Sequence, residues 1–413
     1  MLQHLDEALE RLIAPMRADE FFHDYYGRKT LIIRGTPDKF AAIYDEERWR
    51  TVPLTETTAV YQTEYDGVPL SRVVPIPPAQ LHQFFEAGLL TVGRLDSQPH
   101  IAALMDGLRA SLQFPSGKVS NVDKALCFAS RGNTGYKLHW DLHHNFILQI
   151  AGAKHWRYGH EPAVDAPVDG AGLAGPGEPA IHYDGQAILT PRLEDLPEDT
   201  LHPGDFLYMP PGVWHAPCSL GHSNHISIAL GHRPIYKLIS DVLKLEIGRK
   251  RWWRQGFPAL RGADRHSGAV PQHVMGLFAE AIARLRDELA ELDLRQLHKE
   301  WSLEVAEHHG GRPQTPPAPV TMHERLTRAT PVPIRYCLAA SEDDPTETEV
   351  YIFAGDERYV RLPEGAQQFV ARLAAEQEFV AESALQWDPD FEWPEVQGAL
   401  TRLLAEGILV RAA

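Results

Sequence analysis

The chain has 413 residues, of which 44% are apolar, and it carries a formal net charge of −16. This length predicts two or three domains with cores of ordinary size, and the acidic balance disfavours a direct partnership with nucleic acid. Its three cysteines are widely spaced without a disulfide framework or C-x-x-C motif, and no apolar run approaches the ~18 residues that cross a bilayer. We therefore expect a cytoplasmic protein that contacts neither membrane nor nucleic acid directly.

The first 120 residues predict a mixed α/β segment. The N-terminal sequence MLQHLDEALERLIAPM has charges among its apolar positions, which is typical of an amphipathic helix and not of a signal peptide. Further on, TLIIRG is a short β-branched run closed by glycine, and it predicts a strand.

Between Lys124 and Pro234 the pattern changes to short strands separated by turn residues. The predicted strands are KALCFAS, YKLHWD, NFILQIAG, KHWRYG, DFLYMP and HISIAL. A series of this kind predicts an antiparallel sandwich or barrel. Residues 160–203 interrupt the series with a Pro- and Gly-rich insert, which we interpret as a long loop at the mouth of the barrel.

The chain after the barrel predicts two further domains, so that the three domains span residues 1–234, 235–309 and 316–413. The middle domain repeats apolar residues at three- and four-residue spacing and is expected to be helical. Its basic run GRKRWWRQ could bind RNA, but we interpret it as a helix that packs two tryptophans. A Pro-rich linker follows, and the last domain mixes strands with two helices, as a winged-helix-like module does.

A histidine followed two residues later by an acid could mark a metal site. The pattern occurs at His4/Asp6, His139/Asp141, His182/Asp184 and His298/Glu300. Residues i and i+2 share a face on a strand but diverge by about 200° on a helix. The first and last copies lie in helical patterns, and the third precedes a DG hairpin-turn signal. Only the second copy, in LHWDLHHNF, therefore predicts a pair that can act together.

His139 and Asp141 gain a third candidate ligand from HPGDFLYMPPGVWHAP, where a Pro-Pro-Gly turn positions His215. Two imidazoles and one carboxylate on one face of an octahedron suit Fe(II) and leave positions for a cosubstrate and O₂. Lys154 would be a lone cation inside the barrel, which implies an anion there. A keto acid that chelates iron at one end and meets this ammonium at the other would satisfy both. Each residue alone is more often structural, so the prediction depends on their combination.

These motifs resemble the JmjC 2-oxoglutarate oxygenases, and in particular the ribosomal oxygenases. The resemblance covers LHWDLHHNFILQIAGAKHWRYG, PGDFLYMPPGVWHAP and the N-terminal FFHDYYGRKTLIIRG. It implies a mainly β fold, namely a double-stranded β-helix or jelly-roll barrel of the cupin-like type with an N-terminal α/β segment. A helical domain that forms a homodimer and a C-terminal winged-helix-like domain would follow.

The resemblance also implies a role for single residues. His139, Asp141 and His215 would be the Fe(II) ligands, and Lys154 would bind the distal carboxylate of 2-oxoglutarate. The further residues expected to contact or assist the cosubstrate are Asn145, which matches an asparagine of the asparaginyl hydroxylase of the hypoxia-inducible factor, Ser227 and Tyr136. The chain departs from some ribosomal oxygenases at Ala125 and Cys127, where those enzymes have Asn and Tyr. We therefore expect different cosubstrate contacts and a different substrate pocket.

The expected function is that of an Fe(II)- and 2-oxoglutarate-dependent dioxygenase that hydroxylates a polypeptide. The resemblance suggests an arginine or histidine side chain of a ribosomal protein, and the acidic chain would attract such basic proteins. Two alternatives stay open: an oxygenase of a biosynthetic peptide or small molecule, and a non-catalytic metal-binding cupin scaffold. Lys154 and Asn145 argue against the scaffold, because a metal binder has no need of an anion clamp. Nothing in the sequence separates the other two.

Overall fold

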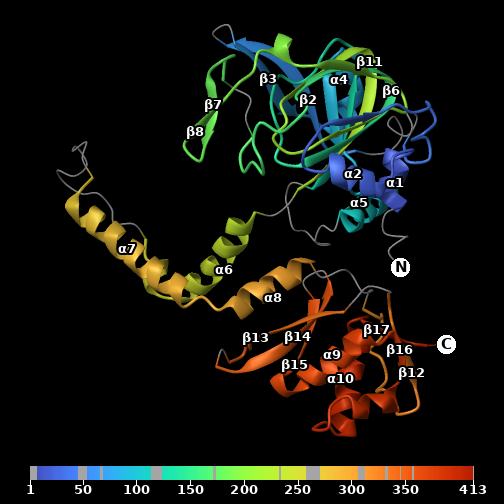
Figure 1. The fold of residues 1–413 in the computed structure, drawn as a ribbon, viewed down its shortest axis with the longest axis vertical. Coiled ribbons are helices and arrows are strands. Elements are labelled where there is room, and N and C mark those ends of the chain that lie inside the picture. Colours follow the sequence, from blue (N-terminus) through green and yellow to red (C-terminus); the bar gives the residue numbers. More distant parts are fainter. Residues whose placement is uncertain are drawn as a thin grey trace. The chain divides into compact units, whose positions relative to one another are not determined.

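The computed structural model describes residues 7–44, 54–65, 68–112, 123–170, 174–231, 234–256, 270–305, 312–330, 334–344, 346–355 and 358–412 (Figure 1). The chain divides into two compact units, one of residues 1–114 and 120–232 and the other of residues 115–119 and 233–413. In the described part of the chain, no helix has the length and apolar character needed to cross a membrane. The predicted division of the second unit into a helical domain and a C-terminal domain stays a prediction.

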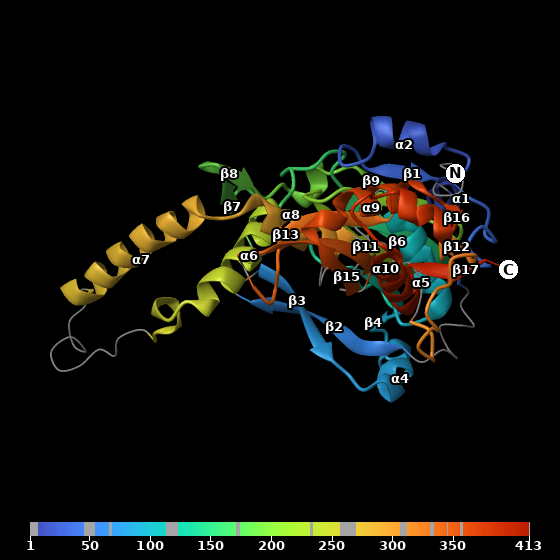
Figure 2. The same ribbon diagram turned by 90° about the horizontal axis from the view of Figure 1, so that it is seen from below.

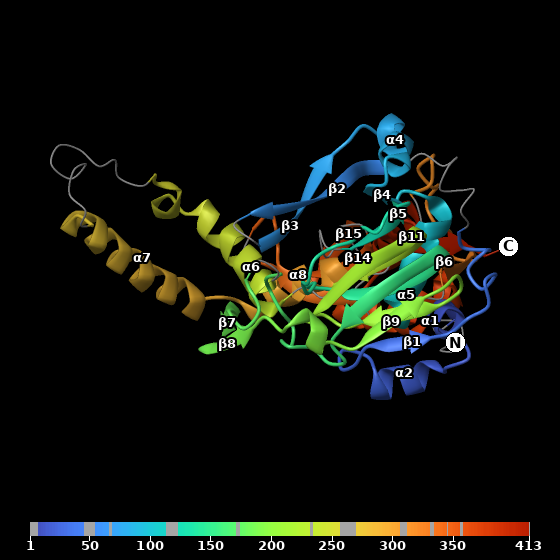
Figure 3. The ribbon, with the colours of Figure 1, turned by 90° about the horizontal axis from the view of Figure 1, so that it is seen from above.

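A nine-stranded antiparallel sheet forms the described body of the first unit. Its strands are β1 (Leu31–Ile33), β2 (Thr55–Tyr65), β3 (Val68–Pro75), β4 (Leu90–Arg94), β5 (Lys124–Ser130), β6 (His144–Tyr158), β9 (Glu198–Leu201), β10 (Phe206–Met209) and β11 (His215–Leu230). They pair in the order β1-β10-β6-β11-β5-β4-β2-β3, with β9 also on β6. Figure 3 shows β5, β11 and β6 side by side. The mainly β, jelly-roll type of fold is therefore confirmed.

Helices cover one face of this sheet. They are α1 (Glu7–Ile13), α2 (Ala18–Asp24) and α5 (Pro99–Ser111), while α4 (Leu81–Glu86) packs beside β4 (Figure 2). Leu9, Phe21 and Leu108 from the helices join Cys127 and Phe146 from the sheet in one apolar core. Because successive residues of a strand point to opposite faces, the neighbours of these core residues in β5 and β6 are turned toward the other face. That face lines a cavity.

The two longest strands, β6 and β11, have 15 and 16 residues and run antiparallel over most of their length. Their register shifts at two places, one between Ser219 and Ser223 of β11 and one where β6 has an extra residue. Gln149 pairs with His225, whereas Ala151 pairs with Asn224, the immediate neighbour of His225. Two steps along β6 thus match one step along β11, which is the signature of a β-bulge.

The bulge exchanges the two faces of β6. Asn145 before it and Lys154 after it line the same cavity, although an odd number of positions separates them. Gly152 follows the bulge with a φ of 63°, and a Cβ there would lie 1.9 Å from the carbonyl oxygen of His222. Only glycine fits this position, so the sequence QIAGAK builds the irregularity that turns Lys154 inward.

The insert at residues 160–203 is more ordered than the predicted long loop. It contains a hairpin of β7 (Pro179–Tyr183) and β8 (Gln186–Leu189), and β9 at its end pairs with β6. The hairpin turns at Asp184 and Gly185, whose φ angles of 50° and 77° agree with the DG turn signal. The loop prediction is wrong for these parts, because strands of four or five residues show too few alternations to stand out in a Pro- and Gly-rich segment.

The region that the sequence predicts to be helical contains α6 (Ile235–Arg249), α7 (Gln272–Ala290) and α8 (Leu294–Val305) in the second unit. The basic run after α6 packs its aromatic residues within this unit. The guanidinium of Arg284 lies 4.6 Å from the ring centre of Trp252, and the indole N–H of Trp253 donates to Glu288 over 3.4 Å. Both partners belong to α7, which supports the structural interpretation of this run over RNA binding.

The C-terminal part of the second unit contains two three-stranded sheets, β16-β12-β17 and β13-β14-β15, in its described residues. The elements are β12 (Arg325–Arg328), β13 (Arg335–Ala340), β14 (Thr348–Gly355), β15 (Arg358–Pro363), α9 (Gln367–Ala375), β16 (Glu378–Val380), α10 (Trp393–Ala405) and β17 (Leu409–Arg411). Val350, Phe369 and Leu400 belong to their shared core. Both predicted helices and a β-hairpin are present, as the winged-helix-like expectation requires, whereas β12, β13 and β16 were not predicted.

Candidate functional site

The segment that carries His139 and Asp141 is not the regular strand that the sequence predicts. Isolated bridges join it to β11, one of them between His139 and His215. A Cβ on Gly135 would lie 1.7 Å from the carbonyl oxygen of Pro217, so glycine permits this close approach. The segment therefore reaches the start of β11 without forming a continuous ladder, and the strand prediction for YKLHWD is wrong.

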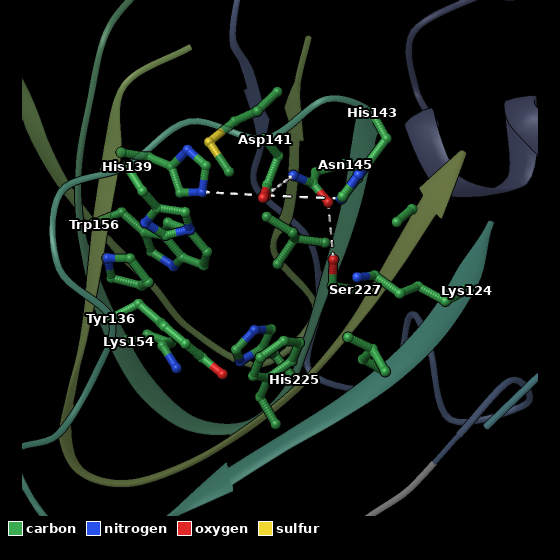
Figure 4. A pocket seen from close by; sticks show the side chains of 17 residues that line it. Lys124, Tyr136, His139, Asp141, His143, Asn145, Lys154, Trp156, His225 and Ser227 are labelled. Atoms are coloured by element: carbon green, nitrogen blue, oxygen red, sulfur yellow. Dashed lines mark hydrogen bonds and ion pairs between the residues drawn. The ribbon is translucent and has the colours of Figure 1, made fainter. Parts of the chain in front are cut away.

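His139, Asp141 and His215 nevertheless converge, with one possible ligand atom from each within 4.8 Å of the others (Figure 4). His215 Nε2 lies 3.5 Å from Asp141 Oδ2. The backbone orients both rings, since Nδ1 of His139 lies 2.6 Å from the carbonyl oxygen of Lys137 and Nδ1 of His215 lies 2.9 Å from that of Val213. With the Nδ1–H groups donated to these carbonyls, each Nε2 is free to act as a metal ligand.

Hydrogen bonds also orient the carboxylate. Asn145 Nδ2 donates to Asp141 Oδ2 over 2.7 Å, and Ser227 Oγ donates to Asn145 Oδ1 over 3.2 Å. Burial raises the pKa of Asp141, but the interactions with His215 and the other nearby imidazoles outweigh it and hold this pKa well below its usual range. Burial lowers the pKa of His139 to about 4. At neutral pH the group thus offers an ionised carboxylate and a neutral imidazole, the forms that bind metal.

These side chains line a cavity of about 260 Å³ that also contains Lys154. Lys154 is only 1% exposed, and its ammonium forms no hydrogen bond or ion pair with the residues that the structure describes. Burial lowers its pKa to about 7. An unpaired buried ammonium is unfavourable unless an anion joins it. The cavity therefore holds both a set of possible metal ligands and a cation that would bind an anion.

Every predicted site residue reaches this cavity. Besides the residues above, Tyr136 and Ser227 line it, and burial raises the pKa of Tyr136 to about 12, so that its hydroxyl remains protonated at neutral pH. Five further polar or aromatic lining residues were not among the predicted site residues: Lys124, Phe128, His143, Trp156 and His225. His225 lies two residues before Ser227 on β11, and this same-face spacing is a signal that could have identified it.

Ala125 and Cys127 do not lie in the cavity wall, so the expected difference in cosubstrate contacts stays a prediction and does not come from direct contact with these two side chains. Both side chains are fully buried in the core beneath the helices, and the residues of β5 that line the cavity are Lys124, Leu126 and Phe128. The alternation of a strand places Ala125 and Cys127 on the face opposite to Lys124, Leu126 and Phe128. It does not show which of the two faces lines the cavity. On β5, a difference from other enzymes in the cavity wall would therefore lie at Lys124, Leu126 or Phe128.

Of the other histidine–acid pairs, those within the described residues do not form comparable groups. His4 and Asp6 lie outside the described residues, and His182 and Asp184 belong to the β7–β8 hairpin. His298 and Glu300 lie on α8, as the helical pattern predicts. Within the described ranges, His139, Asp141 and His215 are the group whose donor atoms could share a metal ion.

Residues 113–238 match the family model of the JmjC domain. The chain is 28% identical over 262 residues to the uncharacterized protein YxbC of Bacillus subtilis (strain 168), a match that covers 59% of this chain and 76% of that protein. It is also 28% identical over 273 residues to ribosomal oxygenase 1 of Gallus gallus, covering 61% of this chain and 42% of that protein.

A structure of YcfD, a ribosomal oxygenase from Escherichia coli in complex with cobalt and succinic acid, aligns with 97% of this chain and 99% of its own at 16% identity, with a TM-score of 0.46. The sequence matches to the two relatives above span less than half of the Gallus gallus protein and about three quarters of YxbC. The matched segment contains the cavity-lining residues of β5, β6 and β11 and the segment between β5 and β6. The segment that contains the cavity therefore matches the JmjC domain model, and the chain is similar to a protein named a ribosomal oxygenase.

Proposed function

We propose that this protein is an Fe(II)- and 2-oxoglutarate-dependent hydroxylase of a polypeptide, specifically of a ribosomal protein. The observation that carries the proposal is the shared cavity, in which the group of His139, Asp141 and His215 accompanies the buried, unpaired ammonium of Lys154. A cavity for metal alone does not need this cation. The combination therefore favours an oxygenase over a non-catalytic metal-binding scaffold.

His139, Asp141 and His215 would hold the iron. Two imidazole nitrogens and one carboxylate oxygen are the donor set that suits Fe(II) while leaving positions open. When bound, the iron supplies the redox chemistry in which 2-oxoglutarate and O₂ yield succinate and CO₂ and one oxygen atom enters a C–H bond of the substrate. The chain contributes the fixed orientation of both rings and of the carboxylate, through the backbone carbonyls and through Asn145.

Lys154 would bind the distal carboxylate of 2-oxoglutarate. Its ammonium has no competing partner among the described residues, so binding of the anion removes an unfavourable buried charge. Asn145 and Ser227, which support the metal end, and Tyr136, which lies near Lys154 in Figure 4, would line the space between the two ends. The apolar side chains between them keep water out of the reaction space.

The nature of the target is the finer part of the proposal. Ribosomal proteins are basic, and a chain of net charge −16 attracts them over long distances at low salt. The resemblance suggests arginine or histidine, and we favour histidine because Lys124 adds a second cation to the cavity wall. A guanidinium is always charged and would be repelled, whereas an imidazole can enter uncharged. The same negative charge supports the absence of a direct hold on nucleic acid.

We also propose a homodimer that forms through the helices of the second unit. α7 carries exposed apolar residues at alternating three- and four-residue spacing, namely Met275, Phe278, Ile282, Leu285 and Leu289. This is the spacing of a helix that packs along a second helix. Light scattering tests the proposal, because the full chain should have twice the monomer mass and Ile282→Glu should lower it. A monomeric wild-type chain would contradict it.

The free thiols of Cys127, Cys218 and Cys337 agree with the proposed cytoplasmic location.

The decisive experiment compares intact ribosomal proteins from a wild-type strain, a deletion strain and a strain with the His139→Ala variant. We expect one protein in the wild-type strain to be heavier by one oxygen atom, and peptide sequencing to place that atom on a histidine. Location on arginine would retain the hydroxylase and reject the choice of histidine. If no ribosomal protein differs while the purified enzyme oxidises a small molecule or a precursor peptide, the alternative oxygenase function replaces the proposal.

A further inference from the structure

His225 is a buried histidine of the cavity wall that the proposed function does not yet use. It is 3% exposed, and it lines the cavity from β11. Neither ring nitrogen forms a hydrogen bond with any residue in the described ranges, and Nδ1 is enclosed without a partner. Burial, followed by the nearby charge of Lys154, lowers the pKa of His225 well below its usual range. The ring is therefore neutral and carries one N–H group.

The ring of Phe128 fixes where His225 lies in the cavity. His225 stacks on it with ring centres 4.7 Å apart and planes 3° from parallel. The ammonium of Lys154 lies 5.9 Å from the centre of the same ring, and the ring of Tyr136 lies 6.1 Å away. Figure 4 shows Lys154, Tyr136 and His225 together at the end of the cavity away from Asp141. Three polar side chains thus surround one aromatic ring at the anion end.

A second buried histidine of the same sheet shows what a purely structural role looks like. His144 is 3% exposed and stacks on Tyr26 with ring centres 4.6 Å apart, but its Nδ1 has a partner in the hydroxyl of Tyr208 at 2.7 Å. It does not line the cavity. His225 has the same burial and the same kind of stacking without such a partner, so no described residue fixes its tautomer and Nε2 can carry the N–H group toward a ligand.

We propose that His225 is a positioning residue for the cosubstrate, whose neutral imidazole donates its N–H to the carboxylate that Lys154 attracts. The inference rests on the proposed function for the identity of that anion. An ammonium attracts charge with little directional preference, whereas a stacked ring holds its donor in one direction. The pair would therefore fix how the distal carboxylate is oriented and how far from the metal ligands it sits. His225 would favour 2-oxoglutarate over 2-oxo acids of other lengths.

The test measures ligand binding without turnover on the full chain loaded with Mn(II), by calorimetry. The two probes are 2-oxoglutarate and oxalate, which chelates a metal in the same way but is too short to reach His225. We expect His225→Leu to weaken 2-oxoglutarate binding by roughly ten- to a hundredfold, since a hydrogen bond to a charged group is lost, and to leave oxalate binding unchanged. His225→Gln, which keeps an N–H donor near the position of Nε2, should recover most of the affinity. His144→Leu is the matched control and should leave both affinities unchanged.

The other outcomes separate the inference from the proposed function. If His225→Leu binds 2-oxoglutarate as wild type does while Lys154→Met does not, the donor role of His225 is refuted and the hydroxylase stands. A parallel loss of oxalate and 2-oxoglutarate, or an equal loss in His144→Leu, would show that the imidazole only supports the fold. If the wild-type protein binds 2-oxoglutarate no better than oxalate, the proposed function itself fails.

Discussion

The two ends of the cavity differ in how completely the protein satisfies its own polar groups. At one end, both histidines and the aspartate have hydrogen-bond partners that fix their direction. At the other end, Lys154 and His225 have no such partners among the described residues. The first end is thus organised before any ligand arrives, and the second is left for a ligand to complete.

This difference has an energetic meaning. Groups that are already oriented lose little further freedom when a metal binds, which favours tight and specific binding. An unpaired buried ammonium instead lowers the stability of the free protein, and an arriving anion restores it. Substitution at the first end should therefore weaken metal binding. Substitution of Lys154 at the second end should weaken anion binding but stabilise the ligand-free protein.

The largest effect should come from Asp141→Ala or His139→Ala, which breaks the organised end. Removing one donor from a set of three should abolish tight Fe(II) binding and with it all 2-oxoglutarate decarboxylation. Metal titration and a decarboxylation assay measure the two effects, and His182→Ala on the hairpin is the control. Full turnover in both variants would mean that the metal binds elsewhere.

Lys154→Met should act at the other end alone. The loss of an ammonium–carboxylate interaction should weaken 2-oxoglutarate binding by roughly ten- to a hundredfold, because such an interaction contributes ~1.5–3 kcal/mol. Metal affinity should remain at the wild-type value, since Lys154 is not one of the three residues whose donor atoms could share a metal ion. Calorimetric titration with 2-oxoglutarate decides this prediction, and an unchanged affinity would remove the anion clamp from the proposal.

The pH dependence of 2-oxoglutarate binding should come from the same lysine. The pKa of Lys154 in the free protein is lowered to about 7, so the ammonium loses its proton as the pH rises above this value. Binding then requires proton uptake, and affinity should fall by up to roughly tenfold per pH unit above neutrality. Lys154→Arg, which stays protonated, should show no such fall between pH 7 and about 9. A wild-type affinity that is flat over this range would contradict the lowered pKa.

Ser227→Ala should have a smaller effect at the organised end. The hydroxyl donates to Asn145, which in turn donates to Asp141. Its loss therefore weakens the orientation of the Asp141 carboxylate indirectly, through Asn145. A neutral hydrogen bond of this kind contributes ~0.5–1.5 kcal/mol, which predicts a two- to tenfold weaker Fe(II) affinity. If Ser227→Ala weakens 2-oxoglutarate more than the metal, the serine belongs with the cosubstrate instead.

The last effect is on stability and has the opposite sign. In the ligand-free protein, Lys154→Met should raise the free energy of unfolding at pH 7, by up to about 4 kcal/mol if the whole lowering of the lysine pKa is relieved. The lysine titrates near 10.5 when unfolded and near 7 when folded, so its destabilisation is complete below pH 7 and fades toward pH 10.5. The advantage of the Met variant should shrink accordingly in thermal melts at rising pH. A destabilised Met variant would show that the ammonium has a partner after all.

The sequence alone predicts much of this site, because its chemistry depends on residue types in a recognisable order. His139, Asp141, His215 and Lys154 could be found from spacing and from the cost of a buried cation. The strand assigned to YKLHWD was wrong because a hydrophobic pattern cannot show whether a segment forms a full ladder or only isolated bridges. That distinction depends on Gly135 and on the close approach of β11.

The walls of the cavity were harder to predict. A strand such as KALCFAS has a small or apolar residue at nearly every position, so its pattern does not reveal which face meets the helices and which meets the cavity. The sequence could therefore not show that Ala125 and Cys127 face the core. The sequence shows His225 only as a histidine near His215 that could support a metal ligand or be an ordinary strand residue, and the stacking on Phe128 and the missing partner distinguish it in the structure.

The bulge in β6 has a consequence for how related chains can be recognised. The strand has two phases, and the extra residue between Gln149 and Ala151 marks the switch from one to the other. Straightening the strand at constant length would turn Lys154 outward and bring His155 inward. A chain that lacked the extra residue and kept a straight strand would again present its lysine to the cavity. The interval from His139 to Lys154 is therefore a property of the strand's phase, and a search with one fixed interval would overlook chains that share the same chemistry.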